Sequence, residues 1–577
     1  MKLIMNKIKI NVMRKYIIYI ASFVGAALLQ TGCYDDKGDY DYHDVNTMEI
    51  VIPETKLRMP KEEAVEVSIM PQISQTLEQN EEDLVFQWKR LNSNATLGSD
   101  RLIDYTNYSV GKECKITVEP NESNNIGLML VISDKRNGTM WYQQGQVTII
   151  KPFNPCWFIL QEKENKGMLG AIEGTPEGYY VYPDIFQSEA GTMFPLDGKP
   201  LAVTARRKYG GDRASISMMP PSFGLKIVPI LTLVTDKDAA LFTPSTLEMM
   251  YKSDKILFEP VQQGKTIKID DYKMDKNGEL FVNDGKSYFA YMDGFCIPYS
   301  IKSETGDYLS VSTYGSYGTG LVFFDSSTHS FLSGQALSGF SDYMNVSYYK
   351  SKPIRSGSSK WTDSNPITVS SIDLDEEGGA FDPNHIDPSL QVKDIITGGS
   401  YGNYAYAVTA PFNGKELTVF KFSADWENED PTCAAKYTIA VPSEVDVETA
   451  KFAASYAYTA NIIFMASGNK LYRINLDRGQ VTELYAYEVD SSAQIASLKF
   501  KDPESVREES DKEAEGEYKE KLGMCLGLGI NTGEKGVVVE IQLTMAGDIS
   551  REERSVCVYE DPNQPIGKIV DITYNYE

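Results

Sequence analysis

Residues 461–485, NIIFMASGNKLYRINLDRGQVTELY, decide the fold class of this chain. The run 462–466 is apolar, and apolar and polar side chains alternate in 470–474 and 480–485. A turn of Ser467, Gly468 and Asn469 separates the first two runs. Short runs of this kind, bounded by Gly, Asn and Asp, are typical of β-strands joined by tight turns. The stretch therefore predicts three consecutive antiparallel strands.

The same pattern recurs further along the chain. Residues 523–529 (GMCLGLG), a turn at 533–536 (GEKG) and residues 537–541 (VVVEI) repeat the strand–turn–strand unit. Repetition of such units is typical of β-propeller blades, although the chain has no WD or kelch motif. We therefore predict that 151–577 is a β-propeller-like domain of about seven blades, in which 568–574 completes the first blade. Tandem β-sandwiches are the alternative, and 501–520 is predicted to be a charged insertion.

A second block of β-strands precedes this region. Residues 47–150 contain several short runs with the two-residue period of half-buried strands, among them 64–69 (AVEVSI), 84–88 (LVFQW), 114–118 (CKITV), 128–133 (LMLVIS) and 146–150 (QVTII). Short strands at this spacing predict a β-sandwich. Trp88 is expected to be an anchor of its core. The fold class is therefore all-β, with an N-terminal sandwich and a larger C-terminal domain.

The first residues of the chain have the pattern of a lipoprotein leader. A basic start without acids is followed by an apolar run at 16–29, which is shorter than the roughly 20 residues needed to span a bilayer. Gly32 and Cys33 then form a junction at which the cysteine would be lipidated, although Gln30 departs from the usual leucine. We expect 1–32 to be the signal peptide and 33–46 an acidic tether. Asp35 and Asp36 resemble a surface-export tag.

The tether and the sandwich together resemble a known family. Residues 33–42 (CYDDKGDYDY), 86–89 (FQWK), 130–134 (LVISD) and 147–149 (VTI) are similar to the PKD-like family of bacterial surface lipoproteins. The resemblance implies an outer-membrane, lipid-anchored protein that faces the cell exterior. It also implies an accessory role in nutrient uptake beside a TonB-dependent transporter, with a glycan or peptide as ligand.

Composition excludes one class of partner and leaves the cysteines undetermined. The net charge is −25, and phosphate backbones are bound by clustered Lys and Arg, so no nucleic-acid partner is expected. Of the seven cysteines, no two have the C-x-x-C spacing of zinc or redox sites. Apart from Cys33, most are expected to be buried apolar residues. The spacing leaves disulfide pairing open.

Catalytic motifs are absent from the sequence. The only histidines are His43, His329 and His385, so neither an H-E-x-x-H zinc site nor a histidine-based triad is indicated. We therefore predict a protein that is not an enzyme and needs no cofactor. Two alternatives stay open: a carboxylate-based polysaccharide hydrolase or lyase on the propeller, and a structural partner of a transporter complex.

One acidic run has the oxygen spacing of a calcium loop. Asp373, Asp375 and Glu377 alternate ahead of Gly378 and Gly379. An EF-hand loop would place Glu at its twelfth position, where this chain has Asn384. Calcium is therefore a candidate ligand here, against the alternative of a solvated loop.

Aromatic residues among serines and glycines are the predicted binding residues. They are Tyr314, Tyr317, Tyr343, Tyr348, Tyr349 and Trp361. An exposed aromatic ring can cover the apolar face of a sugar or a peptide side chain at low entropic cost. The alternative is that these rings pack between blades.

Overall fold

The computed structural model describes residues 46–576 with internal gaps. The gaps are 60–62, 77–79, 94, 121, 123, 176–177, 211–225, 257–265, 276–277, 292–298, 304, 306, 308, 310, 312, 319, 335–366, 375–378, 425–430 and 505–521. The chain divides into two compact units, Met1–Ile149 and Ile150–Glu577. No helix within the described ranges has the length and apolar character required to cross a bilayer.

Unit 1 is a β-sandwich. Its strands are β1 (Met48–Val51), β2 (Thr55–Arg58), β3 (Val65–Ile69), β4 (Gln72–Gln75), β5 (Leu84–Leu91), β6 (Tyr105–Val110), β7 (Cys114–Val118), β8 (Ile126–Asp134) and β9 (Met140–Ile150), with a short 3-10 helix at Leu102–Asp104. One sheet has the order β2-β9-β8-β5-β6, and the pairs β1-β4 and β3-β7 complete the domain. The alternation in the sequence produces this arrangement, because β7 buries every second residue.

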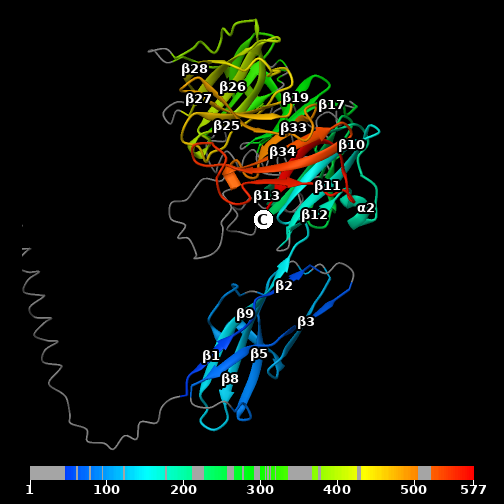
Figure 1. The fold of residues 1–577 in the computed structure, drawn as a ribbon, viewed down its shortest axis with the longest axis vertical. Coiled ribbons are helices and arrows are strands. Elements are labelled where there is room, and N and C mark those ends of the chain that lie inside the picture. Colours follow the sequence, from blue (N-terminus) through cyan, green and yellow to red (C-terminus); the bar gives the residue numbers. More distant parts are fainter. Residues whose placement is uncertain are drawn as a thin grey trace, which may run out of the picture. The chain divides into compact units, whose positions relative to one another are not determined.

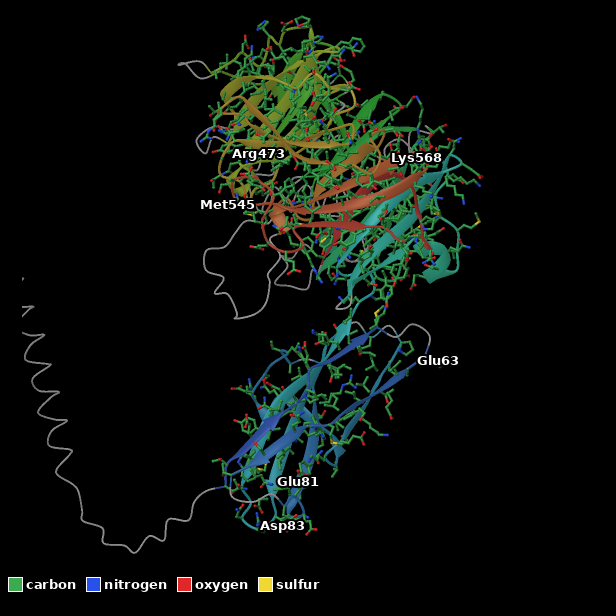
Figure 2. The ribbon with its side chains drawn as sticks, viewed as in Figure 1. Glu63, Glu81, Asp83, Arg473, Met545 and Lys568 are labelled. Atoms are coloured by element: carbon green, nitrogen blue, oxygen red, sulfur yellow. The ribbon has the colours of Figure 1, made fainter. Side chains whose placement is uncertain are left out.

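Trp88 lies in the core of this sandwich, as predicted. Its side chain is fully buried, and its indole Nε1 donates to the Lys112 carbonyl at 3.2 Å. Around this core, surface ion pairs join one loop to another. Lys112 pairs with Glu81 at 2.7 Å and Arg136 with Asp83 at 3.6 Å, and both acids are labelled in Figure 2.

The described strands of unit 2 form two eight-stranded and three four-stranded sheets (Figure 1). Each eight-stranded sheet joins two neighbouring groups of four antiparallel strands, so the described strands are numbered here as seven four-stranded blades, 1–7. Blade 1 contains β37 (Ile566–Asn575), β10 (Cys156–Lys163), β11 (Lys166–Thr175) and β12 (Gly178–Tyr182), and blade 2 contains β13 (Pro200–Gly210), β14 (Lys226–Thr235), β15 (Ala239–Phe242) and β16 (Met249–Lys252). Blade 3 contains β17 (Ile269–Asp275), β18 (Gly278–Asn283), β19 (Lys286–Tyr291) and β20 (Tyr299–Ser303). Blade 4 contains β21 (Tyr314–Tyr317), β22 (Gly320–Asp325), β23 (Ser330–Gly334) and β24 (Ile367–Ser371). Blade 5 contains β25 (Leu390–Gly398), β26 (Tyr404–Pro411), β27 (Glu416–Ser423) and β28 (Thr432–Ala440). Blade 6 contains β29 (Lys451–Ala453), β30 (Ile462–Ser467), β31 (Lys470–Asn475) and β32 (Gln480–Ala486). Blade 7 contains β33 (Gln494–Phe500), β34 (Cys525–Thr532), β35 (Lys535–Gln542) and β36 (Val556–Tyr559). The helices α2 (Ile185–Ala190) and α3 (Ser253–Ile256) and the 3-10 turns at Ser400–Gly402 and Leu522–Met524 lie in the connections.

The C-terminal strand closes the ring of blades. β37 pairs with β10 along its length, from Cys156↔Asn575 to Glu162↔Lys568, and this confirms that 568–574 completes the first blade. The first strand of each blade contacts the first strand of the next, in the cyclic order β37, β13, β17, β21, β25, β29, β33 and back to β37. Unit 2 is therefore propeller-like, and the alternative of tandem sandwiches is wrong.

Packing between blades explains why these middle strands are buried at every position. β18, β22 and β30 bury all of their residues, because each blade has a neighbour on both faces. Aromatic rings fill the interface between blades 4 and 5, where Phe331 lies 5.0 Å from Phe422 and 5.6 Å from Phe420, ring centre to ring centre. Each buried ring of this size stabilises the fold by about 2–3 kcal/mol.

Polar contacts add ties within and between blades. Arg473 on β31 donates to the Ala546 carbonyl at 2.9 Å, beside Met545 in the loop after β35 (Figure 2). In blade 1, Lys568 on β37 lies 3.7 Å from Glu162 on β10. Among the described cysteines, Cys114, Cys156, Cys433 and Cys525 are buried, as predicted, and Cys557 is partly buried; none of these five forms a disulfide.

Candidate binding cavity in the propeller

A cavity of about 760 Å³ lies along the inner strands of the propeller. Residues of β13, β17, β25, β29, β33 and β37 line it, together with Thr313, which precedes β21. A cavity of this size at the centre of a fold is the usual place for a small ligand. We therefore take it as the candidate site.

The inner strands run in the same direction around this cavity. Between β13 and β37, Val203 contacts Asp571 and, two residues later, Ala205 contacts Thr573. Between β17 and β25, Lys273 contacts Asp394 and Asp275 contacts Thr397. Because both residue numbers rise together, the starts of these strands meet at one opening, called here the first mouth, and their ends meet at the second mouth.

Asp571 ties three blades together in the middle of the cavity wall. Its Oδ1 accepts from the Ser497 hydroxyl at 2.7 Å, and its Oδ2 accepts from Lys499 Nζ at 2.6 Å and from the Val203 backbone N–H at 3.1 Å. The Asp571 side chain is 11% exposed. This carboxylate therefore has a structural role, since its oxygens are already occupied by groups from β33 and β13.

Lys273 and Asp394 form a second cross-blade pair. Their side chains form an ion pair, and Lys273 Nζ also donates to the Ile395 carbonyl at 2.6 Å and the Thr313 hydroxyl at 3.2 Å. Near the second mouth, Arg206 donates to the Asp275 carbonyl at 2.6 Å and to Glu504 at 3.0 Å. These contacts join blades 2, 3, 5 and 7 around the cavity.

A buried ion pair within blade 7 contacts two aromatic residues of blade 1. Lys501 Nζ lies 2.9 Å from Glu540 Oε2, and the same oxygen accepts from the Trp157 indole at 2.8 Å. Lys501 Nζ also lies 4.4 Å from the centre of the Tyr574 ring. Because both charges are desolvated and mutually satisfied, this group stabilises the ring and is poorly placed to bind a ligand.

Among the residues that the structure describes, Asp271 and Lys451 are the charged side chains of the first mouth that lack such partners. Asp271 accepts one hydrogen bond, from its neighbour's backbone N–H, Tyr272 N, at 2.8 Å. The side chain is reached by solvent, yet it stands inside the protein-walled mouth, and loss of bulk water there raises the pKa of its carboxyl. The adjacent Asp394 raises this pKa further, while Lys273 and Lys451 lower it.

The prediction that Tyr314 and Tyr317 are exposed binding residues is wrong. Tyr314 and Tyr317 lie in β21, which is buried at every position, and the Tyr314 hydroxyl donates to the Gly278 carbonyl. Burial raises the pKa of Tyr314 well above its ordinary value. Both rings pack between blades, which was the alternative interpretation. The remaining predicted binding residues, Tyr343, Tyr348, Tyr349 and Trp361, lie outside the described residues.

The predicted calcium loop and lipid anchor are only partly covered by the structure. Asp373 is exposed after β24, whereas Asp375, Glu377 and Cys33 lie outside the described residues. Within the described ranges, no three His, Cys, Asp or Glu side chains are grouped so that they could hold a metal ion. Calcium binding and lipidation stay predictions.

The sequence contained a pattern that points to the cavity and was missed. In β17, Asp271, Lys273 and Asp275 are spaced two residues apart, so their side chains leave the same face of the strand. Lys499 and Lys501 repeat this spacing at the end of β33. Charged residues of both signs on one face of a strand in a closed propeller indicate the wall of the central channel.

The comparisons bear first on the N-terminal part of the chain. A family model described as PKD-like family matches residues 33–200. This part of the chain is PKD-like. The match covers the sandwich and continues through β10, β11 and β12 of blade 1. A PKD-like domain joined to a propeller-like domain indicates, at a general level, a surface or binding protein.

The comparison with solved structures finds matches that share little sequence with this chain. A quinonprotein alcohol dehydrogenase-like protein from Bacteroides thetaiotaomicron is 11% identical, with 90% of this chain and 97% of that chain covered and a TM-score of 0.38. Hsv2 from Kluyveromyces lactis is 8% identical, with 68% and 93% covered and a TM-score of 0.30. The dihydro-heme d1 dehydrogenase NirN is 8% identical, with 73% and 77% covered and a TM-score of 0.34. The comparison with curated proteins finds no match.

Proposed function

We propose that this protein is a lipid-anchored outer-membrane protein, exposed on the cell surface, that captures a glycan or peptide ligand in the central cavity of its propeller. Capture would serve a nutrient-uptake system, with a TonB-dependent transporter as the partner that receives the ligand. The anchor would be lipid on Cys33, with the PKD-like sandwich between the anchor and the binding domain.

This proposal is supported mainly by the hydrogen bonds and ion pairs of the side chains that line the cavity. Most of its charged side chains are held by cross-blade partners, as at Asp571 and at Lys273. Groups held in this way keep the cavity open and rigid, and a rigid cavity loses little entropy when a ligand binds. This supports binding without chemical change as the function.

Attachment to a membrane would strengthen a modest affinity. A tethered domain meets ligand released near its partner at an effective concentration set by the tether, which can reach the millimolar range for short flexible linkers. The ligand would then pass to the transporter without being lost to the medium. In this proposal the anchor is as necessary to function as the cavity.

The test is a calorimetric binding screen of the full-length protein in detergent against a panel of oligosaccharides and short peptides. Ala450→Trp would place a large side chain in the cavity wall, and we expect it to reduce binding at least about tenfold. Ala434→Trp, at an exposed position on β28, is the matched control. Equal binding by the two variants would exclude the cavity as the site.

A second candidate function is hydrolysis by carboxylates in the same cavity. It is favoured by Asp271, because a carboxyl whose pKa is raised by burial can act as a general acid, and Asp394 lies near it. Chromatography of the panel after incubation with the protein separates the two functions. If the wild-type protein forms cleavage products and the Asp271→Asn variant does not, the function is hydrolysis and not capture.

A further inference from the structure

We propose that the first mouth binds a zwitterionic ligand, the class to which free amino acids and short peptides belong. The Lys451 ammonium would bind the ligand's carboxylate and the Asp271 carboxylate its ammonium. This inference rests on the proposed function and deepens it, because it chooses peptide over glycan.

The first step is the position of the two charges. Asp271 lies on β17 of blade 3, and Lys451 is the first residue of β29 of blade 6. Two inner strands, β21 and β25, lie between β17 and β29 on the shorter way around the ring. In a ring of seven inner strands this is the largest possible separation, so Asp271 and Lys451 lie on opposite sides of the cavity. Both side chains line the cavity, and the charge of Lys451 acts on the titration of Asp271. A ligand long enough to span the mouth would contact both.

The second step is that these two groups are available. The Lys451 side chain is exposed to the cavity and makes no hydrogen bond or ion pair with any residue that the structure describes. Within the same described part of the chain, the Asp271 carboxylate accepts only the hydrogen bond from the backbone N–H of Tyr272. The other lysines of this region are engaged: Lys273 with Asp394, Lys393 with Glu448 at 2.7 Å, and Lys499 with Asp571 at 2.6 Å.

The third step is the charge balance of the mouth. The three lysines with partners and their three carboxylates cancel, which leaves one positive charge at Lys451 and one negative charge at Asp271. A purely anionic ligand would be repelled by Asp271, and a purely cationic one by Lys451. A neutral sugar would desolvate both charges without supplying a countercharge, which is unfavourable. A ligand with both charges satisfies both side chains.

The test uses triglycine as the probe in calorimetric titrations of the full-length protein. N-acetyl-triglycine lacks the ammonium, triglycine amide lacks the carboxylate, and maltotriose represents a neutral glycan. We expect triglycine to bind, and each capped form to bind at least about tenfold more weakly, as expected for loss of a charge-assisted hydrogen bond. Failure of triglycine to bind, or equal binding of all three peptides, would overturn the inference.

Variants test whether Lys451 and Asp271 are the residues that bind the two charged groups of the ligand. Lys451→Gln and Asp271→Asn should each weaken triglycine at least about tenfold. Lys535→Gln, at the exposed first residue of β35, and Glu534→Gln, in the exposed turn before it, are matched controls that should leave affinity unchanged. The exchange variant Asp271→Lys with Lys451→Asp should bind more tightly than either single reversal, since the ligand can turn around. No effect of Lys451→Gln in a variant with unchanged thermal stability would contradict the assignment.

The outcomes distinguish this inference from the proposed function. If maltotriose binds and Ala450→Trp abolishes its binding while triglycine does not bind, the cavity captures glycans and the zwitterion inference is wrong. If neither probe nor any member of the wider panel binds, both proposals fail.

Discussion

Replacement of Asp571 by alanine tests whether the cross-blade hydrogen bonds hold the propeller closed. The change removes the acceptor of three hydrogen bonds, from Ser497, Lys499 and Val203. Val203 is fully buried, so its N–H would be left without an acceptor, at a cost of about 1–3 kcal/mol. Lys499 would lose its counterion, but its side chain is 36% exposed and water would replace part of that interaction. Together these losses lower the free energy of unfolding by about 3 kcal/mol.

Calorimetry measures this loss directly. For a domain of about 430 residues the unfolding entropy near the midpoint is about 0.9 kcal/mol/K, so 3 kcal/mol corresponds to a fall in Tm of about 3 °C. Asp571→Asn keeps an acceptor for Val203 but loses the charge, and about half the fall is expected. Glu534→Ala, on an exposed turn, is the control and should not change Tm. A fall below 1 °C for Asp571→Ala, or equal falls for alanine and asparagine, would refute the reasoning.

Three further predictions concern other parts of the molecule. Trp88→Ala should destabilise the sandwich by about 3–5 kcal/mol in urea unfolding followed by circular dichroism, and leave the propeller transition in place; a single shifted transition would show that the units unfold together. Asp271→Asn should raise Tm at pH 7, because a carboxyl whose pKa is raised by folding destabilises the fold at every pH above its pKa in the unfolded chain. The gain should therefore vanish below about pH 4, and a gain that persists at pH 3 would contradict this. Gly527→Ala should lower stability by about 1–3 kcal/mol, because a Cβ there would lie 2.3 Å from the Trp157 ring; wild-type Tm in calorimetry would show that the ring can move.

Most of the strand pattern could be predicted because it depends on local alternation. The run KLYRIN became β31 and KIVDITY lies within β37, since side chains in a strand alternate between faces whatever surrounds them. Closure of the ring was also predictable, because a propeller needs partners for its first and last blades. Trp88 followed from its place in an alternating run.

The segment around Tyr314 is where a prediction from local residue composition was wrong. Gly315 and Ser316 resemble loop residues, yet they lie in β21 against blade 5. A Cβ on Gly315 would lie 2.6 Å from Ile395, so glycine is needed for the close approach of β25. The Ser316 N–H donates to Asp275 at 3.0 Å and to Thr397 at 2.8 Å. A residue composition that favours a loop can therefore also mark a tightly packed inner strand.

By itself, the sequence determined the all-β class, the two-part organisation, the closing strand and the Trp88 core anchor, because hydrophobic periodicity and turn residues act over a few neighbouring positions. The tertiary structure alone decided which polar residues share a cavity. Asp271 and Lys451 are 180 positions apart, and only closure of seven blades places both on one mouth. It also decided which charges are available, since an ion pair such as Lys273 with Asp394 forms only when distant strands pack side by side. No local spacing encodes that distinction, because it depends on which strands the ring makes neighbours.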